Sequence, residues 1–173
     1  MRLTITINLT PSHRRAGQQQ MDYGARVQLS RGDVAWLKAR LRELSQNLGF
    51  MEGAWALQII TDAEMKTLHH RFLGINTTTD VMTFDMRPSP APVKSDLLQL
   101  DTAICIDEAQ RQSSRRNVPL RSELLLYAVH SLLHVSGYDD RTPAAARRMH
   151  RREDELLETL GIGPVYESVG GGK

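Results

Sequence analysis

The chain has 173 residues, of which 40% are hydrophobic and 24% are charged, and its formal net charge at pH 7 is +2. This size and composition suit one globular domain with a sizeable core and exclude a polycation. No apolar run is long enough to span a bilayer, and residues 1–7 lack the apolar core of a signal peptide. Because Cys105 is the single cysteine, an intrachain disulfide and a multi-cysteine zinc site are excluded, and a cytoplasmic protein without membrane partners is expected.

Alternating and helical patterns predict two strands and one helix in the first third of the chain. Residues 3–9 alternate apolar and polar side chains, which predicts a strand, and the Gln-rich segment 11–23 that follows predicts a loop. Ser30 is a suitable cap for a helix that ends at Gly49, because Asp33 stands three residues later. The apolar segment 55–60 predicts the second strand.

A second capping pattern begins the next helix. Thr61 precedes Glu64 by three residues, and the apolar spacing continues to about residue 72, before Gly74. Its last turn carries His69, His70 and Arg71, where the helix dipole favours cations.

The middle of the chain predicts two further strands and a short helix. We expect strands at residues 79–84 and 97–106, joined by a loop in the proline-rich segment 87–92. Asp107 is expected to cap a helix that ends near residue 116.

Two helices complete the predicted domain. Asn117 and Pro119 mark the start of the first, whose apolar residues cover most of its circumference, so it should be buried. Thr142 and Pro143 form a cap and first-position pair for the second, which stops at Gly161. We expect one domain over residues 1–165 and a flexible tail over residues 166–173.

The buried helix carries a pattern typical of a metal site. His130 and His134 stand four residues apart, so their imidazoles lie on one helical face and can bind one divalent cation. Gly137 then ends the helix, and the carboxylates of Asp139 and Asp140 follow the turn. The alternative interpretation is a core helix with incidental polar residues, but two imidazoles in an apolar helix are unfavourable unless they bond or ligate something.

The position after the first histidine distinguishes this helix from that of a zinc peptidase. In the H-E-x-x-H helix the glutamate is the general base, whereas here the residue is Ser131. A serine cannot take a proton from water at neutral pH by itself, so a peptidase is disfavoured.

Arginines cluster on both sides of the histidine helix, and 18 of the 22 basic residues are arginines. Such a basic collar would suit a polyanionic substrate, and a guanidinium could stabilise a phosphodiester transition state. Solvated helix faces are the competing interpretation of the same clusters.

The motif at residues 130–140, HSLLHVSGYDD, resembles the H-x-x-x-H-x-x-G-Y-D-H motif of the YbeY endoribonuclease (rRNA maturation factor) family. The segment 68–74, LHHRFLG, and the following TDVMTF at 79–84 are similar to the family's helix, arginine and T-D-V-L-S-F-like strand. The segment LDTAICI at 100–106 resembles the family's G-D-I-x-I. The resemblance covers roughly residues 55–162, with order and spacing preserved.

The resemblance implies an α+β (α/β) domain in which a small mixed four-stranded sheet packs with about five helices, one of them a zincin-like metal helix. It implies one zinc ion per chain and endonuclease activity on single-stranded RNA. The implied role is in small-subunit ribosomal RNA maturation and ribosome quality control, with the small subunit and its proteins as partners. His130 and His134 match the first two metal ligands, and Arg71 matches the arginine that contacts RNA phosphate near the metal.

The third ligand position departs from the family motif, because Asp140 replaces a histidine there. An aspartate can bind zinc through oxygen, and it could instead favour a harder ion such as Mn²⁺ or Mg²⁺. Asp139 is expected to support the turn or to form a hydrogen bond to a metal ligand. His150 is a weaker ligand candidate, expected at the surface of the last helix, and His13, in a loop, is expected to be inert.

Two alternative functions stay open at the level of sequence. One is a metal-bearing ribosome- or RNA-binding assembly factor with weak or no nuclease activity, which the substitution at Asp140 keeps possible. The other is a metal-dependent hydrolase of a peptide or small molecule, against which Ser131 counts.

Overall fold

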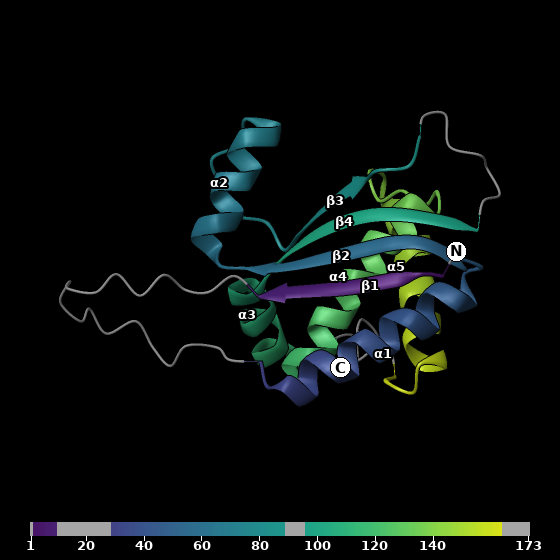
Figure 1. Cartoon of the computed structure of the whole chain (residues 1–173). Coiled ribbons are helices and arrows are strands. Elements are labelled where there is room, and N and C mark those ends of the chain that lie inside the picture. The colour runs from purple at the N-terminus through teal and green to yellow at the C-terminus, as the bar shows by residue number, and fades with distance from the viewer. Residues whose placement is uncertain (1, 10–28, 89–95, 164–173) are drawn as a thin grey trace.

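The computed structural model of the chain describes residues 2–9, 29–88 and 96–163. In these residues it contains four strands and five helices, as predicted, in an α+β arrangement (Figure 1). The predicted loop at 11–23, most of the proline-rich segment and the predicted tail at 166–173 lie outside the described residues. None of the helices in the described part is long and apolar enough to cross a membrane.

The four strands form one mixed sheet in the order β1-β2-β4-β3. β1 (Thr4–Leu9), β2 (Glu52–Ile60) and β4 (Leu97–Cys105) run parallel to one another. β3 (Val81–Asp85) pairs with β4 in the antiparallel direction and forms one edge of the sheet. The predicted mixed sheet is therefore confirmed.

β2 starts three residues before the predicted strand because pairing with β4 continues past the apolar segment. Gly53 lies opposite Leu98 in the parallel register, with a backbone φ of 106°. A Cβ atom at this position would lie 2.0 Å from the carbonyl oxygen of Leu98, so the close approach of the two strands requires glycine.

The first two helices begin at the predicted capping boxes. α1 (Arg31–Asn47) is capped by Ser30, and α2 (Asp62–Leu73) is capped by Thr61. In each box the cap hydroxyl accepts a hydrogen bond from the backbone of the third helical residue, whose carboxylate accepts one from the cap backbone. The sequence pattern located both starts because the cap contacts are local.

The expected cap of α3 (Ile106–Arg116) was wrong. β4 runs directly into this helix, so Cys105 occupies the cap position and Asp107 lies in the first turn. The Asp107 carboxylate instead accepts a 2.7 Å hydrogen bond from the backbone N–H of Asp62, the first residue of α2. Asp107 therefore caps a neighbouring helix, which only the tertiary arrangement brings within reach.

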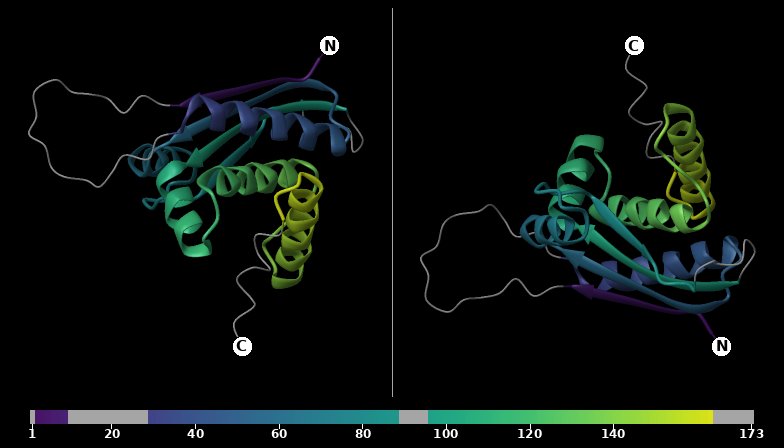
Figure 2. Two further views of the ribbon diagram at one scale, coloured as in Figure 1. Left: turned by 90° about the horizontal axis from the view of Figure 1, so that it is seen from below. Right: turned by 90° about the horizontal axis from the view of Figure 1, so that it is seen from above.

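α4 (Leu120–Val135) is the central helix of the fold, and most of its residues are buried. It lies on one face of the sheet with α1, and α5 (Pro143–Thr159) covers the side of α4 farther from the sheet (Figure 2). On the other face, Met65 of α2 packs in a small separate cluster with Met82, Ala103 and Cys105. The histidine-bearing helix is thus held between the sheet and α5.

Candidate metal centre

The end of α4 turns the chain back toward the histidines. Gly137 has a φ of 94°, and the backbone N–H of Tyr138 donates a 3.0 Å hydrogen bond to the carbonyl oxygen of Leu133. This left-handed glycine closes the helix, as the sequence predicted. The residues after the turn, including Asp140, therefore return to the face of α4 that carries His130 and His134.

The three predicted ligands come together at this point. The Nε2 atoms of His130 and His134 lie 3.0 Å apart. Oδ2 of Asp140 lies 3.7 Å from Nε2 of His130 and 3.9 Å from Nε2 of His134. One ligand atom from each residue lies within 4.8 Å of the others, which is a geometry that could hold a metal ion.

The other ring nitrogen of each histidine has its own acceptor. Nδ1 of His130 lies 2.7 Å from Oε1 of Glu153, and Nδ1 of His134 lies 3.2 Å from the carbonyl oxygen of Tyr138. If both Nδ1 atoms carry protons, both Nε2 atoms present lone pairs, and two lone pairs at this separation repel each other. A divalent cation removes that repulsion, so the residues present fit a bound metal.

The surroundings of His130 favour positive charge. Burial by itself lowers the pKa of this imidazole, but the hydrogen bond and negative charge of Glu153, with the charges of Asp80 and Asp140, outweigh burial and raise the pKa above its ordinary value. The same negative field would stabilise a cation bound at Nε2.

Glu153 is a component of this centre that the sequence analysis missed. Its side chain is fully buried, and its Oε2 atom has no hydrogen-bond partner among the described residues. The sequence did contain a sign of this role, because Glu153 lies between Met149 and Leu156 at helical spacing, on the apolar face of α5. An acidic residue in such an apolar stripe needs a partner, and His130 is that partner.

Ser131 faces the sheet instead of the histidine pair. It is fully buried, and its hydroxyl lies 2.8 Å from Oγ1 of Thr102 and accepts a 3.0 Å hydrogen bond from Oγ1 of Thr83. Ser131, which occupies the position of the peptidase glutamate, therefore connects α4 to β3 and β4 through hydrogen bonds. This geometry agrees with the expectation that the helix does not belong to a peptidase.

The remaining candidates lie apart from the three ligands. Asp139 accepts hydrogen bonds from the backbone and side chain of Arg141, so it supports the turn, as predicted. His150 is half-buried on α5 and does not belong to the ligand group, and His13 lies outside the described residues.

Arg71 is exposed in the last turn of α2, with its guanidinium 5.9 Å from the ring centroid of Phe72. α2 packs on the opposite face of the sheet from α4, so the role of Arg71 stays a prediction.

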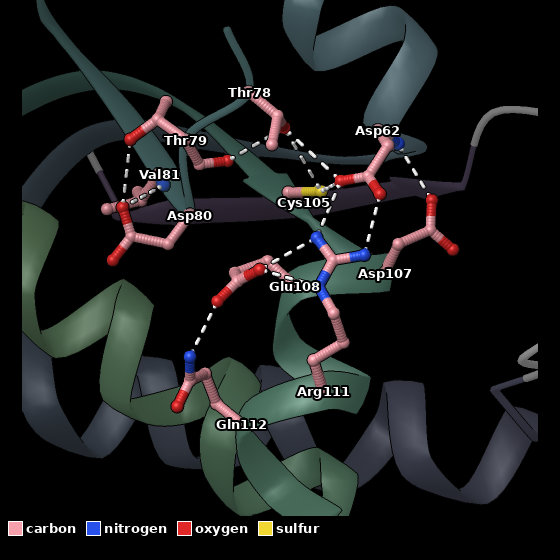
Figure 3. A network of polar contacts seen from close by, with 10 residues as sticks. All are labelled: Asp62, Thr78, Thr79, Asp80, Val81, Cys105, Asp107, Glu108, Arg111 and Gln112. Atoms are coloured by element: carbon pink, nitrogen blue, oxygen red, sulfur yellow. Dashed lines mark hydrogen bonds and ion pairs between the residues drawn. The ribbon is translucent and has the colours of Figure 1, made fainter.

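A second group of potential metal ligands is already paired with the positively charged side chain of an arginine. Asp62, Cys105 and Asp107 also lie within ligand distance of one another, but the guanidinium of Arg111 binds both carboxylate oxygens of Asp62 at 2.7 and 2.9 Å (Figure 3). Burial, with the hydrogen bond to Asp62, raises the pKa of the Cys105 thiol to about 12. This group therefore serves as an ion-pair network, and the histidine group is the candidate metal centre.

The chain matches known protein sequences over most of its length. The family model described as Endoribonuclease YbeY matches residues 24–161, which extends the resemblance at residues 55–162 toward the N-terminus. A protein named Endoribonuclease YbeY from Anaeromyxobacter sp. (strain Fw109-5) is 32% identical over 126 residues, covering 73% of this chain and 64% of the relative. Its counterpart from Syntrophus aciditrophicus (strain SB) is 30% identical over 131 residues, covering 74% of this chain and 81% of the relative.

The fold also has a counterpart among solved structures. The solution structure of TM1509 from Thermotoga maritima matches with a TM-score of 0.54 and 19% sequence identity, covering 98% of this chain and 99% of that chain. This likeness supports the fold alone, whereas the family model matches residues 24–161, which include the candidate metal centre, and the two relatives cover 73% and 74% of this chain. The chain therefore belongs to the YbeY endoribonuclease family.

Proposed function

We propose that this protein is a metal-dependent endoribonuclease that cuts single-stranded RNA, with one zinc ion held by His130, His134 and Asp140. The observation that carries the proposal is the convergence of two Nε2 atoms at 3.0 Å, each on an imidazole whose Nδ1 has an acceptor. Membership in the YbeY family supports RNA as the substrate.

The residues around the ligands prepare the site for a cation. Glu153 and the carbonyl oxygen of Tyr138 orient the two imidazoles and direct both Nε2 atoms to one point. A zinc ion bound there would supply a Lewis acid for a phosphodiester substrate. Arg71 is proposed to bind an RNA phosphate, for which its planar guanidinium is suited.

The biological setting belongs to the same proposal. We place the activity in the cytoplasm, in maturation of small-subunit ribosomal RNA and ribosome quality control, with the small subunit and its proteins as partners. The similarity of the metal motif to the family pattern supports these assignments.

The exposure and position of Asp140 favour a second candidate function, in which the metal site is weaker. Its side chain is 40% exposed, and its oxygen lies farther from each Nε2 atom than those atoms lie from each other. A protein with a weaker metal site could act as a metal-bearing RNA- or ribosome-binding assembly factor with weak or no nuclease activity.

The first arm of the experiment measures metal content by elemental analysis, on protein purified without added metal or chelator. The native protein and Asp139→Ala should each contain about one equivalent of zinc, and Asp140→Ala should contain little. Asp139→Ala is the matched control, because the Asp139 carboxylate accepts hydrogen bonds from Arg141 and does not belong to the ligand group. Zinc retained in Asp140→Ala would contradict the proposed ligand set.

The second arm measures cleavage of single-stranded RNA by the same preparations. His134→Ala should lose both zinc and cleavage, whereas Arg71→Ala should lose cleavage and keep zinc. Zinc-loaded native protein that binds RNA without cutting it would refute the nuclease proposal and support the assembly-factor function.

A further inference from the structure

A polar pocket of about 400 Å³ lies between the loop at residues 78–80 and the helices α3 and α4. Asp80 and its two preceding threonines form one side, Glu108, Gln112 and Arg116 of α3 form another, and Tyr127 of α4 completes the lining. Its volume falls within the range of about 300–1,000 Å³ that is usual for small-molecule sites.

This pocket adjoins the candidate metal centre. Tyr127 precedes His130 by three residues in α4, so the two side chains lie on neighbouring turns of one helical face. Asp80, which lines the pocket, is also close enough to His130 for its charge to act on that imidazole. A group bound in the pocket would therefore lie next to anything held at the histidines.

The pocket is rich in hydrogen-bond acceptors. Oδ1 of Asp80 accepts bonds from the Thr79 hydroxyl and the Val81 backbone, and no described residue donates to its Oδ2 atom. The Gln112 amide donates to Glu108 at 2.7 Å, which leaves the Gln112 carbonyl oxygen as an acceptor. The pocket therefore suits a ligand that brings its own N–H or O–H donors.

The charges of the lining exclude a phosphate as the preferred occupant. Asp80 and Glu108 are both acidic, and the one cation among the described lining residues, Arg116, forms a 2.6 Å ion pair with Glu123, which is itself fully buried. A phosphate would meet unfavourable negative charge here, whereas a neutral nucleobase or ribose would not.

A network of ion pairs and hydrogen bonds holds the pocket walls in place (Figure 3). The Arg111 guanidinium binds Asp62 and Glu108, and the Thr78 hydroxyl donates to Asp62 at 3.2 Å. The loop and α3 are thus joined through Asp62, so the pocket exists before any ligand binds. A preformed pocket loses less entropy on binding.

We propose that this pocket binds one nucleoside of single-stranded RNA beside the bond to be cut, and that it prefers bases with an exocyclic amino group over uracil. The inference rests on the proposed function, which places an RNA phosphate at the neighbouring histidines. Single-stranded RNA offers amino and 2′-hydroxyl donors for Asp80 and Gln112. Cytosine carries an amino group where uracil carries a carbonyl oxygen, so the acceptors distinguish the two.

The test compares oligo(C) with oligo(U), two unstructured pyrimidine probes of equal length, by fluorescence anisotropy on the full-length zinc-loaded protein. The native protein should bind oligo(C) about tenfold more tightly, which is the contribution expected of one hydrogen bond to a polar or charged acceptor. Gln112→Ala and Asp80→Asn should each reduce this preference to about twofold or less. Gln110→Ala is the matched control, because this glutamine lies on the same helix, bonds Ser114 and does not line the pocket.

The binding assay would overturn the inference if the native protein bound both probes equally, if both pocket variants kept the preference unchanged, or if Gln110→Ala showed the same loss. Zinc content and melting temperature of Gln112→Ala should equal those of the native protein, which separates a local effect from misfolding. Cleavage of RNA without any base preference would refute the proposed nucleoside site and leave the nuclease proposal unaffected. A preference that depends on Gln112 in a protein without cleavage would refute the nuclease proposal and support the pocket.

Discussion

At the scale of single residues, Glu153 serves the site more than it serves the fold. Its carboxylate is fully buried, and Oε2 lacks a partner among the described residues, which is unfavourable for folding. Its Oε1 atom lies 2.7 Å from Nδ1 of His130, which fixes the orientation of a candidate ligand. A buried carboxylate behind a metal-binding histidine commonly raises the basicity of that ligand.

We therefore predict that Glu153→Gln weakens zinc binding about 10- to 100-fold, because the amide is a poorer acceptor for the Nδ1 proton. Competition with a chromophoric chelator measures this affinity. Glu155→Gln is the control, because that side chain is 59% exposed on the same helix and pairs with Arg152. An unchanged zinc affinity in Glu153→Gln would show that the carboxylate does not support the metal.

At the scale of secondary-structure elements, Asp62 connects α2, α3 and the loop between α2 and β3 (Figure 3). It accepts bonds from Arg111 of α3, Thr78 of the loop and the Cys105 thiol at the end of β4. The bond from Arg111 is the main cause that lowers the pKa of Asp62 to about 2, although partial burial opposes it. These contacts hold together elements that the sequence pattern described only one at a time.

The lowered pKa has a defined consequence for stability in acid. The folded protein keeps Asp62 ionised below the value of 3.8 expected for the unfolded chain, so the contribution is complete above about pH 4 and is lost as the pH falls toward 2. The shift corresponds to about 2 kcal/mol, and because the side chain is 39% exposed, screening by solvent should reduce it to about 1 kcal/mol.

Asp62→Asn should accordingly lower the unfolding free energy of the metal-free protein by about 1 kcal/mol near pH 5, with the difference from native disappearing near pH 2. Urea unfolding at a series of pH values measures this difference. Asp101→Asn, at an exposed position of β4, controls for the removal of one negative charge. A difference that stays constant with pH would mean that the network stabilises by packing and not by charge.

At the scale of the whole molecule, α4 contributes side chains both to the hydrophobic core and to the candidate metal centre. Its apolar residues join the main core cluster with residues of α1, α5 and the sheet, while His130 and His134 lie on its half-buried face. A chain of buried hydroxyls reinforces this packing, because Thr102 accepts a 3.0 Å hydrogen bond from the Trp55 indole and lies 2.8 Å from the Ser131 hydroxyl. The position of the ligands therefore depends on the integrity of the whole core.

Leu132→Ala should lower the free energy of unfolding by about 2–5 kcal/mol, because it leaves a cavity where a fully buried side chain packed. Leu73→Ala, at a position 61% exposed, should change it by less than about 0.5 kcal/mol. Far-UV circular dichroism and tryptophan fluorescence in urea measure both changes, and for a single cooperative core the two signals should coincide. Separate transitions would show that the helices do not share one folding unit with the surroundings of Trp36 in α1 and Trp55 in β2.

Local features made much of the fold predictable. The capping boxes at Ser30 and Thr61 located two helix starts, and apolar periodicity identified α4 and α5 as core helices. The prediction that Asp107 caps its own helix was wrong because its side chain caps a helix that is distant in sequence. The pairing that extends β2 to Glu52 was likewise invisible, since it depends on the partner strand β4.

Local patterns along the chain were enough to identify the candidate ligands, because helical spacing places His130 and His134 on one face and Gly137 turns the chain back toward them. The groups around these ligands come from segments that are distant in sequence. Glu153 comes from α5, the hydroxyls that bind Ser131 come from two strands, and the polar pocket forms where a loop, α3 and α4 meet. Contacts between residues distant in sequence follow from how apolar faces pack together, and that packing has no local signature along the chain.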